Sequence, residues 1–151
     1  TGVKNPMRAL DVARAIPSAH FVMAGGGDLL QEVKEAAPSN VSVIGWAKAE
    51  DLFGVSDLIL STSENEGMPI ALIEAQLASK PVVATNVGGV AEVVISNKTG
   101  FVTRKNTEEL AKALEKLINS KADTSQIEQA LLTKASFTDL ESCLQTVHSL
   151  Y

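Results

Sequence analysis

The sequence predicts an α/β fold, with a parallel sheet that carries helices on both faces. Short apolar runs typical of buried strands alternate with segments whose apolar residues recur every three or four positions. Several of these runs end in turns that contain glycine or proline. With 151 residues, the chain is long enough for one domain with a sizeable core. Strands that alternate with helices are typical of parallel sheets covered on both sides.

The first helix has a clear start signal. Asn5 followed by Pro6 is a good pair for the N-cap and the first helical position, and apolar residues then fall on one helical face up to Pro17. The next apolar run is His20–Ala24, which ends in Gly25–Gly27. This pattern predicts a buried strand followed by a tight turn.

Further helices and strands follow in alternation. Asp28 is expected to cap the second helix, with Gln31 in a capping-box-like pattern, and Thr107 is expected to cap a later one. The other expected strands span residues 41–45, 58–62, 81–85 and 100–103. The other expected helices span residues 29–37, 50–53, 69–80, 90–95, 107–118, 127–134 and 138–150.

The stretch from Ser61 to Lys80 carries the main functional signal. It predicts the end of a strand, a bend at Glu66–Pro69 and a helix. Glu66 lies in the loop before that helix, and Glu74 lies just over one turn inside it. A phosphate could bind at the helix start, and the carboxylates could accept hydrogen bonds from sugar hydroxyls. However, two acids in a strand–turn–helix are common, and most glutamates on helices simply face water.

Three loops are expected to lie at one edge of the sheet. Gly25–Gly27, Glu66–Pro69 and Asn86–Gly89 each follow a strand, and ligands bind outside the carboxyl ends of parallel strands. Other signals are weak. Leu30 stands where a dinucleotide fingerprint needs its third glycine, so a plain turn explains Gly25–Gly27 equally well.

Composition and the lack of other motifs narrow the function. A net charge of -5 argues against broad binding to nucleic acid or anionic membranes. The single cysteine, Cys143, cannot form an internal disulfide, which favours the cytoplasm. His20 and His148 lack nearby ligand partners, so no metal site is expected. No apolar run is long enough for a membrane span, and no signal peptide is recognisable.

Taken together, these residues resemble the C-terminal, donor-binding domain of retaining GT-B glycosyltransferases of family 4, the glycosyl transferases of group 1. Nearly the whole chain takes part in the resemblance. The two glutamates match that family's motif of an acid, seven residues and an acid, with Met68 where phenylalanine is usual. Lys4 matches a lysine in the loop after the domain's first strand, with Asn5 where glycine is frequent. Other matching segments are residues 23–27, 45–46, 56–57, 80–85, 87–92 and 99–101.

The resemblance implies a role for each matching residue. Lys4 would stabilise the leaving diphosphate, and Glu66 would hold the donor sugar, so these two are the catalytic candidates. Glu74 would bind the ribose hydroxyls. Donor contacts are also expected from the glycine turn, the bend and the helix start, at Gly25, Gly26, Gly67, Met68, Pro69, Ile70 and Ala71. The donor would be a nucleotide diphosphate sugar, with no cofactor and no metal.

The resemblance also implies what lies outside the chain. Residues 1–120 would form the Rossmann-like nucleotide-sugar-binding domain of a GT-B fold, without its first strand, and residues 121–151 its C-terminal helices. The family's arginine before the lysine and the N-terminal acceptor domain would precede Thr1. The isolated chain is therefore expected to be inactive, and it could self-associate through its exposed cleft face. The expected location is cytoplasmic, with a peripheral place at the inner face of the membrane open for the full-length protein.

Several functions remain open at this point. The leading one is hexosyl transfer, with retention, to a glycan or lipid-linked acceptor, as in polysaccharide biosynthesis. The alternatives are a GT-B-like sugar-nucleotide epimerase and a non-catalytic nucleotide-sugar-binding module. A phosphoacceptor receiver domain is disfavoured, because Asp57 precedes its strand rather than following one.

Overall fold

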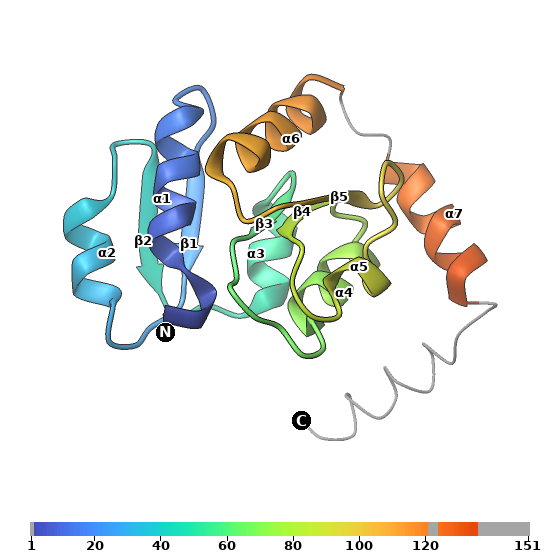
Figure 1. The fold of residues 1–151 in the computed structure, drawn as a ribbon, viewed down its shortest axis with the longest axis horizontal. Helices are drawn as coiled ribbons and strands as arrows, with labels where there is room; N and C mark the ends of the chain where they lie inside the picture. The colour runs from blue at the N-terminus through green and yellow to red at the C-terminus, as the bar shows by residue number, and fades with distance from the viewer. Residues whose placement is uncertain (1, 121–123, 136–151) are drawn as a thin grey trace.

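The computed structural model describes residues 2–120 and 124–135, which form a mixed α/β structure (Figure 1). The expected helix at 138–150, and with it Cys143, lies outside the described residues. The helices are η1 (Gly2–Lys4, a 3₁₀ turn), α1 (Pro6–Ala15), α2 (Leu30–Ala36), α3 (Ala49–Val55), α4 (Ile70–Leu77), α5 (Val90–Val93), α6 (Thr107–Ser120) and α7 (Thr124–Ala135). The strands are β1 (Phe21–Ala24), β2 (Val41–Gly45), β3 (Ile59–Ser61), β4 (Val82–Thr85) and β5 (Gly100–Thr103).

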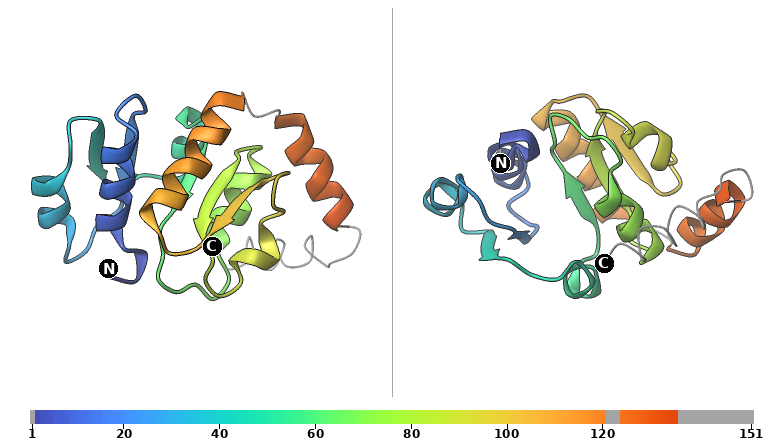
Figure 2. Two further views of the ribbon diagram at one scale, coloured as in Figure 1. Left: turned by 45° about the horizontal axis from the view of Figure 1, so that its top comes forward. Right: turned by 90° about the horizontal axis from the view of Figure 1, so that it is seen from below.

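All strand pairings are parallel, but the strands form two hydrogen-bonded groups. β1 pairs with β2, and β4 pairs with β3 on one side and β5 on the other. No ladder joins β1 to β3 within the described residues. Figure 1 and Figure 2 show the β1–β2 pair with α1 and α2 on one side of the molecule and β3–β5 nearer its middle. The expected strand and helix alternation is therefore present, although the strands are not one continuous sheet.

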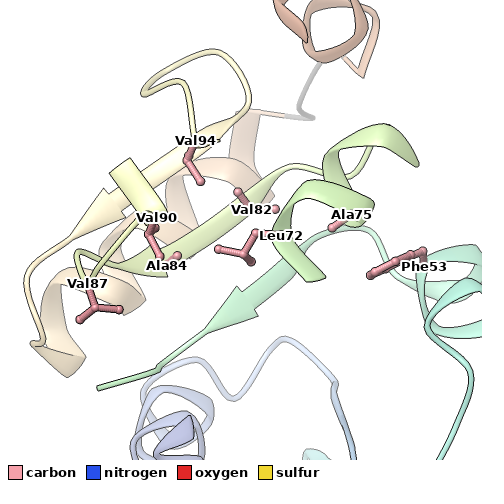
Figure 3. Close-up of a cluster of buried hydrophobic side chains, with 8 residues drawn as sticks. All are labelled: Phe53, Leu72, Ala75, Val82, Ala84, Val87, Val90 and Val94. Carbon is pink, nitrogen blue, oxygen red and sulfur yellow. The ribbon is translucent and has the colours of Figure 1, made fainter. Parts of the chain in front are cut away.

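β4 is the centre of the fold, because all four of its residues are buried. Successive side chains of a strand point to opposite faces, so this strand contributes to two cores. Val82 and Ala84 pack against side chains of α3, α4 and α5 (Figure 3). Val83 points the other way and packs against α1 and α6. Helices thus cover both faces of the three-stranded group.

The second of these cores connects the two groups of strands. It joins Val12 of α1 to Leu110 and Leu114 of α6, and Phe21 of β1 and Leu60 of β3 pack against it. Apolar packing across α1 and α6 therefore holds together two parts that share no strand pairing in the described part of the chain.

One expected helix cap is confirmed and two are wrong. Asn5 caps α1, with its Oδ1 accepting from the N–H of Arg8 at 3.1 Å. At α6 the cap is Asn106 rather than Thr107, because Asn106 Oδ1 accepts from the N–H groups of both Glu108 and Glu109. α2 has no side-chain cap.

The structure also shows what Asp28 and Gln31 do instead. Asp28 lies in a turn two residues before α2, so it is too early to cap that helix. Gln31 is inside the helix, where its Nε2 donates to Glu35 one turn later. The capping-box pattern therefore failed because the helix starts later than the sequence suggested.

Leu114 and Ile118 give a matched test of the core. Both lie on α6, but Leu114 is 1% exposed within the second core, whereas Ile118 is 44% exposed. We expect Leu114→Ala to lower the free energy of unfolding by about 2–5 kcal/mol, because it leaves a cavity. Ile118→Ala should change it by less than about 1 kcal/mol. Urea unfolding of both variants checks this, and equal losses would show that α6 does not anchor the core.

Candidate functional site

The two catalytic candidates meet in the structure, although 62 residues separate them. Lys4 ends η1, Glu66 lies in the loop between β3 and α4, and the Lys4 ammonium donates to Glu66 Oε1. Ser63 Oγ donates to the same oxygen at 2.7 Å. The Glu66 side chain is only 13% exposed, whereas that of Lys4 is 61% exposed. A largely buried carboxylate is thus covered by a cation at the surface.

The environment keeps Glu66 ionised. Burial alone would raise the pKa of its carboxyl group. The hydrogen bonds from Lys4 and Ser63, together with the Lys4 charge, outweigh burial and hold that pKa below its usual value. Glu66 is therefore suited to accept hydrogen bonds from hydroxyl groups and unsuited to act as a general acid.

Backbone contacts hold Lys4 at this place. The N–H of Glu64 donates to the carbonyl of Val3 at 2.7 Å. The Thr62 hydroxyl lies 3.1 Å from the carbonyl oxygen of Lys4 and 2.9 Å from that of Asn5. Asn5 itself has a left-handed backbone with φ of 43°, a conformation that glycine and asparagine adopt most readily.

Glu64 lies at the centre of a cluster of charges beside this pair. Its carboxylate accepts from Asn5 Nδ2 at 2.7 Å and pairs with Arg8 at 2.6 Å and with Lys105 at 3.2 Å. The hydrogen bonds from Asn5 and Lys105, helped by Arg8, lower the pKa of Glu64 to about 2. Lys105 also donates to the Glu64 carbonyl at 2.8 Å, so Glu64 contacts Asn5, helix α1 and the loop between β5 and α6.

The bend after Glu66 leads into α4 as expected, with small differences. Pro69 is buried and occupies the N-cap position, one place earlier than expected. The Ile70 N–H donates to the Met68 carbonyl at 2.9 Å, so it is already engaged within the chain. The Ala71 N–H makes no backbone hydrogen bond within the described residues. Gly67, Met68, Ile70 and Ala71 are exposed, so this surface is open to a ligand.

Glu74 lies on α4, half-buried and one turn beyond the exposed helix start. Within the described residues its carboxylate has no hydrogen bond or ion pair, in contrast to Glu64 and Glu66. Carboxylate oxygens without a protein partner can accept hydrogen bonds from a ligand.

The Asn86–Gly89 loop packs directly on the bend. The Gly89 N–H donates to the Gly67 carbonyl at 3.2 Å. Gly88 has φ of 48°, and a Cβ atom there would lie 1.5 Å from the carbonyl oxygen of Glu66. Glycine is therefore required at this position, and the expectation that these loops lie at one edge is confirmed for this pair.

Gly25 and Gly26 follow β1, and they lie beside the last residue of β2 and the Trp46 that follows it. The Gly25 N–H donates to the Gly45 carbonyl at 2.6 Å. A Cβ atom on Gly26 would lie 2.6 Å from Nε1 of Trp46, whose indole is 86% exposed. No hydrogen bond joins these glycines to the Lys4–Glu66 pair in the described part of the chain.

The residues that support this pair carry no recognisable sequence signal. Ser63, Thr62 and Lys105 belong to no motif, and Glu64 was not singled out although it lies two residues before Glu66. Its partners Asn5 and Lys105 are 59 and 41 residues away, so no local spacing could have connected them.

Residues 2–120 and 124–135 contain neither a membrane-spanning helix nor a cluster of metal-binding side chains. No helix in residues 2–120 and 124–135 is long and apolar enough to cross a bilayer. In the same ranges, no three side chains among His, Cys, Asp and Glu converge as metal ligands would.

Comparison with known proteins decides the family. The model of the family described as "Glycosyl transferases group 1" matches residues 2–120. This chain belongs to the group 1 glycosyltransferases. A curated relative of this glycosyltransferase chain is the Vi polysaccharide biosynthesis protein VipC/TviE of Salmonella typhi, which is 30% identical over 138 residues. That match covers 78% of the chain and 23% of the relative.

A second curated relative is an Escherichia coli enzyme named UDP-Gal:alpha-D-GlcNAc-diphosphoundecaprenol alpha-1,3-galactosyltransferase. It is 28% identical over 116 residues, which cover 68% of the chain and 30% of the enzyme. The glycosyltransferase chain therefore spans less than a third of either relative.

Solved structures confirm the fold. The crystal structure of Anabaena HepE in complex with UDP and glucose aligns with 99% of the chain and 45% of that protein, with a TM-score of 0.81 and 22% identity. A glycosyltransferase from Rickettsia africae aligns with a TM-score of 0.76 and 26% identity, over 86% of the chain and 38% of that protein. The group 1 glycosyltransferase chain thus has the α/β fold of one part of these larger proteins.

The low pKa of Glu64 predicts how stability depends on pH. An unfolded chain would protonate Glu64 near the usual 4.5, but the folded chain does so only near 2. The stability that Glu64 contributes is therefore present above about pH 4.5 and is lost as pH falls towards 2. Glu64→Gln should flatten this part of the stability curve. Denaturant midpoints at pH 3 and pH 6 measure it, and equal pH dependence in both proteins would contradict the prediction.

Proposed function

We propose that this chain is the donor-binding part of a hexosyltransferase. In this proposal the full-length enzyme moves a sugar from a nucleotide diphosphate to a glycan or lipid-linked acceptor, with retention of anomeric configuration. The bond between the anomeric carbon and the diphosphate oxygen breaks, and a bond from the acceptor hydroxyl oxygen to that carbon forms. Negative charge grows on the leaving diphosphate, which takes up the hydroxyl proton. The acceptor site belongs to the part of the enzyme that lies outside this chain.

The single observation that carries the proposal is the Lys4–Glu66 pair beside the exposed start of α4. The Lys4 ammonium is a point charge at the surface, suited to stabilise the leaving diphosphate. Glu66 is ionised and suited to hold donor-sugar hydroxyls. The open surface of Gly67, Met68 and Ala71 lies next in the chain.

Each further site residue has a part in the proposed pocket. Glu74 holds the ribose hydroxyls with a carboxylate that has no partner among residues 2–120 and 124–135. Pro69 shapes the bend. The Ala71 N–H is the helix-start donor that faces the diphosphate, because the Ile70 N–H already donates to the Met68 carbonyl. Gly25 and Gly26 let the donor approach the backbone at the end of β1.

The ligands named for related proteins support a uridine nucleotide as the first to test. HepE was crystallised with UDP and glucose and also with UDP-glucose. The E. coli relative is named for UDP-Gal. We propose that the reaction needs no metal cofactor, because Lys4 supplies the positive charge at the leaving group. A chelator should therefore leave the turnover of the full-length enzyme unchanged.

Glu74→Ala tests the nucleotide site. A UDP concentration about 100 times the dissociation constant should stabilise the wild-type chain by roughly 2.7 kcal/mol, seen as a higher melting temperature. Each charge-assisted hydrogen bond lost with Glu74 is worth about 1.5–3 kcal/mol, so affinity should fall at least tenfold. Glu115→Ala on the exposed face of α6 is the matched control. Unchanged affinity in Glu74→Ala would remove this residue from the site.

Lys4→Ala in the full-length enzyme tests the catalytic assignment. A charge that acts mainly on the leaving diphosphate stabilises the transition state more than the bound donor. We expect kcat to fall by a factor of about 100 or more, and donor affinity by much less. Lys112→Ala, which removes an exposed ammonium paired with Glu108, is the control. The opposite result, weak donor binding with normal kcat, would make Lys4 a ground-state anchor.

A further inference from the structure

Glu64 connects two parts of the fold that no strand pairing joins within the described residues. Lys4 belongs to the part that contains α1, β1 and β2, and Glu66 to the part that contains β3, β4 and β5. The Lys4–Glu66 pair therefore spans both parts. Beyond this pair, Thr62 and Glu64 make the polar contacts between the two parts here. Their partners lie in the first loop, residues 3–5, and in α1.

Glu64 holds both chain neighbours of Lys4. Its N–H donates to the Val3 carbonyl at 2.7 Å, and its carboxylate accepts from Asn5 Nδ2 at 2.7 Å. Lys4 lies between these two residues, so its position follows from theirs. The Lys4 side chain itself is 61% exposed and has little packing of its own to fix its direction.

The contact with Asn5 also stabilises an unusual backbone. Asn5 has φ of 43°, which costs energy for any residue with a Cβ atom. Both ends of its side chain are engaged, with Oδ1 capping α1 and Nδ2 donating to Glu64. Glu64 thereby fixes the Asn5 rotamer, the start of α1 and the direction of the chain at Lys4.

Glu64 also keeps two neighbouring cations away from Glu66 by pairing with them itself. Arg8 and Lys105 both form ion pairs with Glu64. Among the described residues, Lys4 is the one cation that forms an ion pair with Glu66. The Arg8 side chain is only 16% exposed, so loss of its carboxylate partner would leave a largely buried charge unpaired. Arg8 or Lys105 could then compete for Glu66.

We propose that Glu64 is a positioning residue that holds the Lys4 ammonium against Glu66 across the two parts of the fold. The inference rests on the proposed function, since it acts through Lys4. Glu64 does not contact the donor in this assignment. Its effect should appear in the rate of the chemical step and should vanish when the Lys4 ammonium is absent.

A double-mutant cycle in the full-length enzyme tests this. The four proteins are wild type, Glu64→Gln, Lys4→Ala and the double variant. We expect Glu64→Gln to lower kcat by about 10- to 100-fold, the scale of a catalytic group misplaced by about 1 Å, with donor KM within about twofold. In the Lys4→Ala background the same change should lower kcat by less than about twofold.

A merely structural role predicts a different pattern. It would lower kcat by the same factor in both backgrounds, and that result would overturn the inference. Glu108→Gln makes the same charge change at an exposed pair and should leave kcat at the wild-type value. Glu64→Asp keeps the charge but shortens the side chain by one methylene. It should also lower kcat, so wild-type turnover in both Glu64 variants would equally overturn the inference.

The cycle separates failure of this inference from failure of the proposed function. If Lys4→Ala alone leaves kcat unchanged, the proposed catalytic role of Lys4 is wrong, and the proposed role of Glu64 is wrong as well. If Lys4→Ala lowers kcat but the Glu64 effect is equal in both backgrounds, only the role of Glu64 falls. Melting temperatures of all four proteins show that the comparison is made on folded enzyme.

Discussion

The contact between the first loop and the loop after β3 is the interaction on which the candidate site depends. Residues 3–5 and 62–66 are joined by a backbone hydrogen bond, the Thr62 hydroxyl, the Glu64 carboxylate and the Lys4–Glu66 pair. Apolar packing of α1 on α6 brings the two loops near each other, but it is not directional. The polar contacts fix how the two loops are oriented relative to each other, because hydrogen bonds require defined geometry.

The order of the elements could be predicted from the sequence because each one has a local signal. β4 is a continuous apolar run, as expected for a strand buried on both faces, and Asn5 followed by Pro6 marks the start of α1. The pairing of strands is not local. Nothing in the runs that became β1 and β3 shows that these two strands are not hydrogen-bonded to each other.

The helix caps show where local signals stop. Asn106 and Thr107 are adjacent and both suit an N-cap, so propensity alone does not choose between them. The choice follows from the turn after β5, in which the Asn106 N–H donates to the Arg104 carbonyl at 2.7 Å. The site residues also differ in whether a local sequence pattern identifies them. Lys4 and Glu66 could be named because they match a family motif, whereas Glu64 acts through partners that are distant in sequence.

The division of the strands has a consequence for how this chain behaves at high concentration. Five strands in one open sheet would have two edges, but the two groups seen in the described residues have four. Each edge presents backbone donors and acceptors that can pair with another extended chain. β1 and β3 carry no edge-protecting lysine or proline. Pairing of these strand edges with another extended chain is therefore a route to aggregation in addition to the exposed apolar side chains.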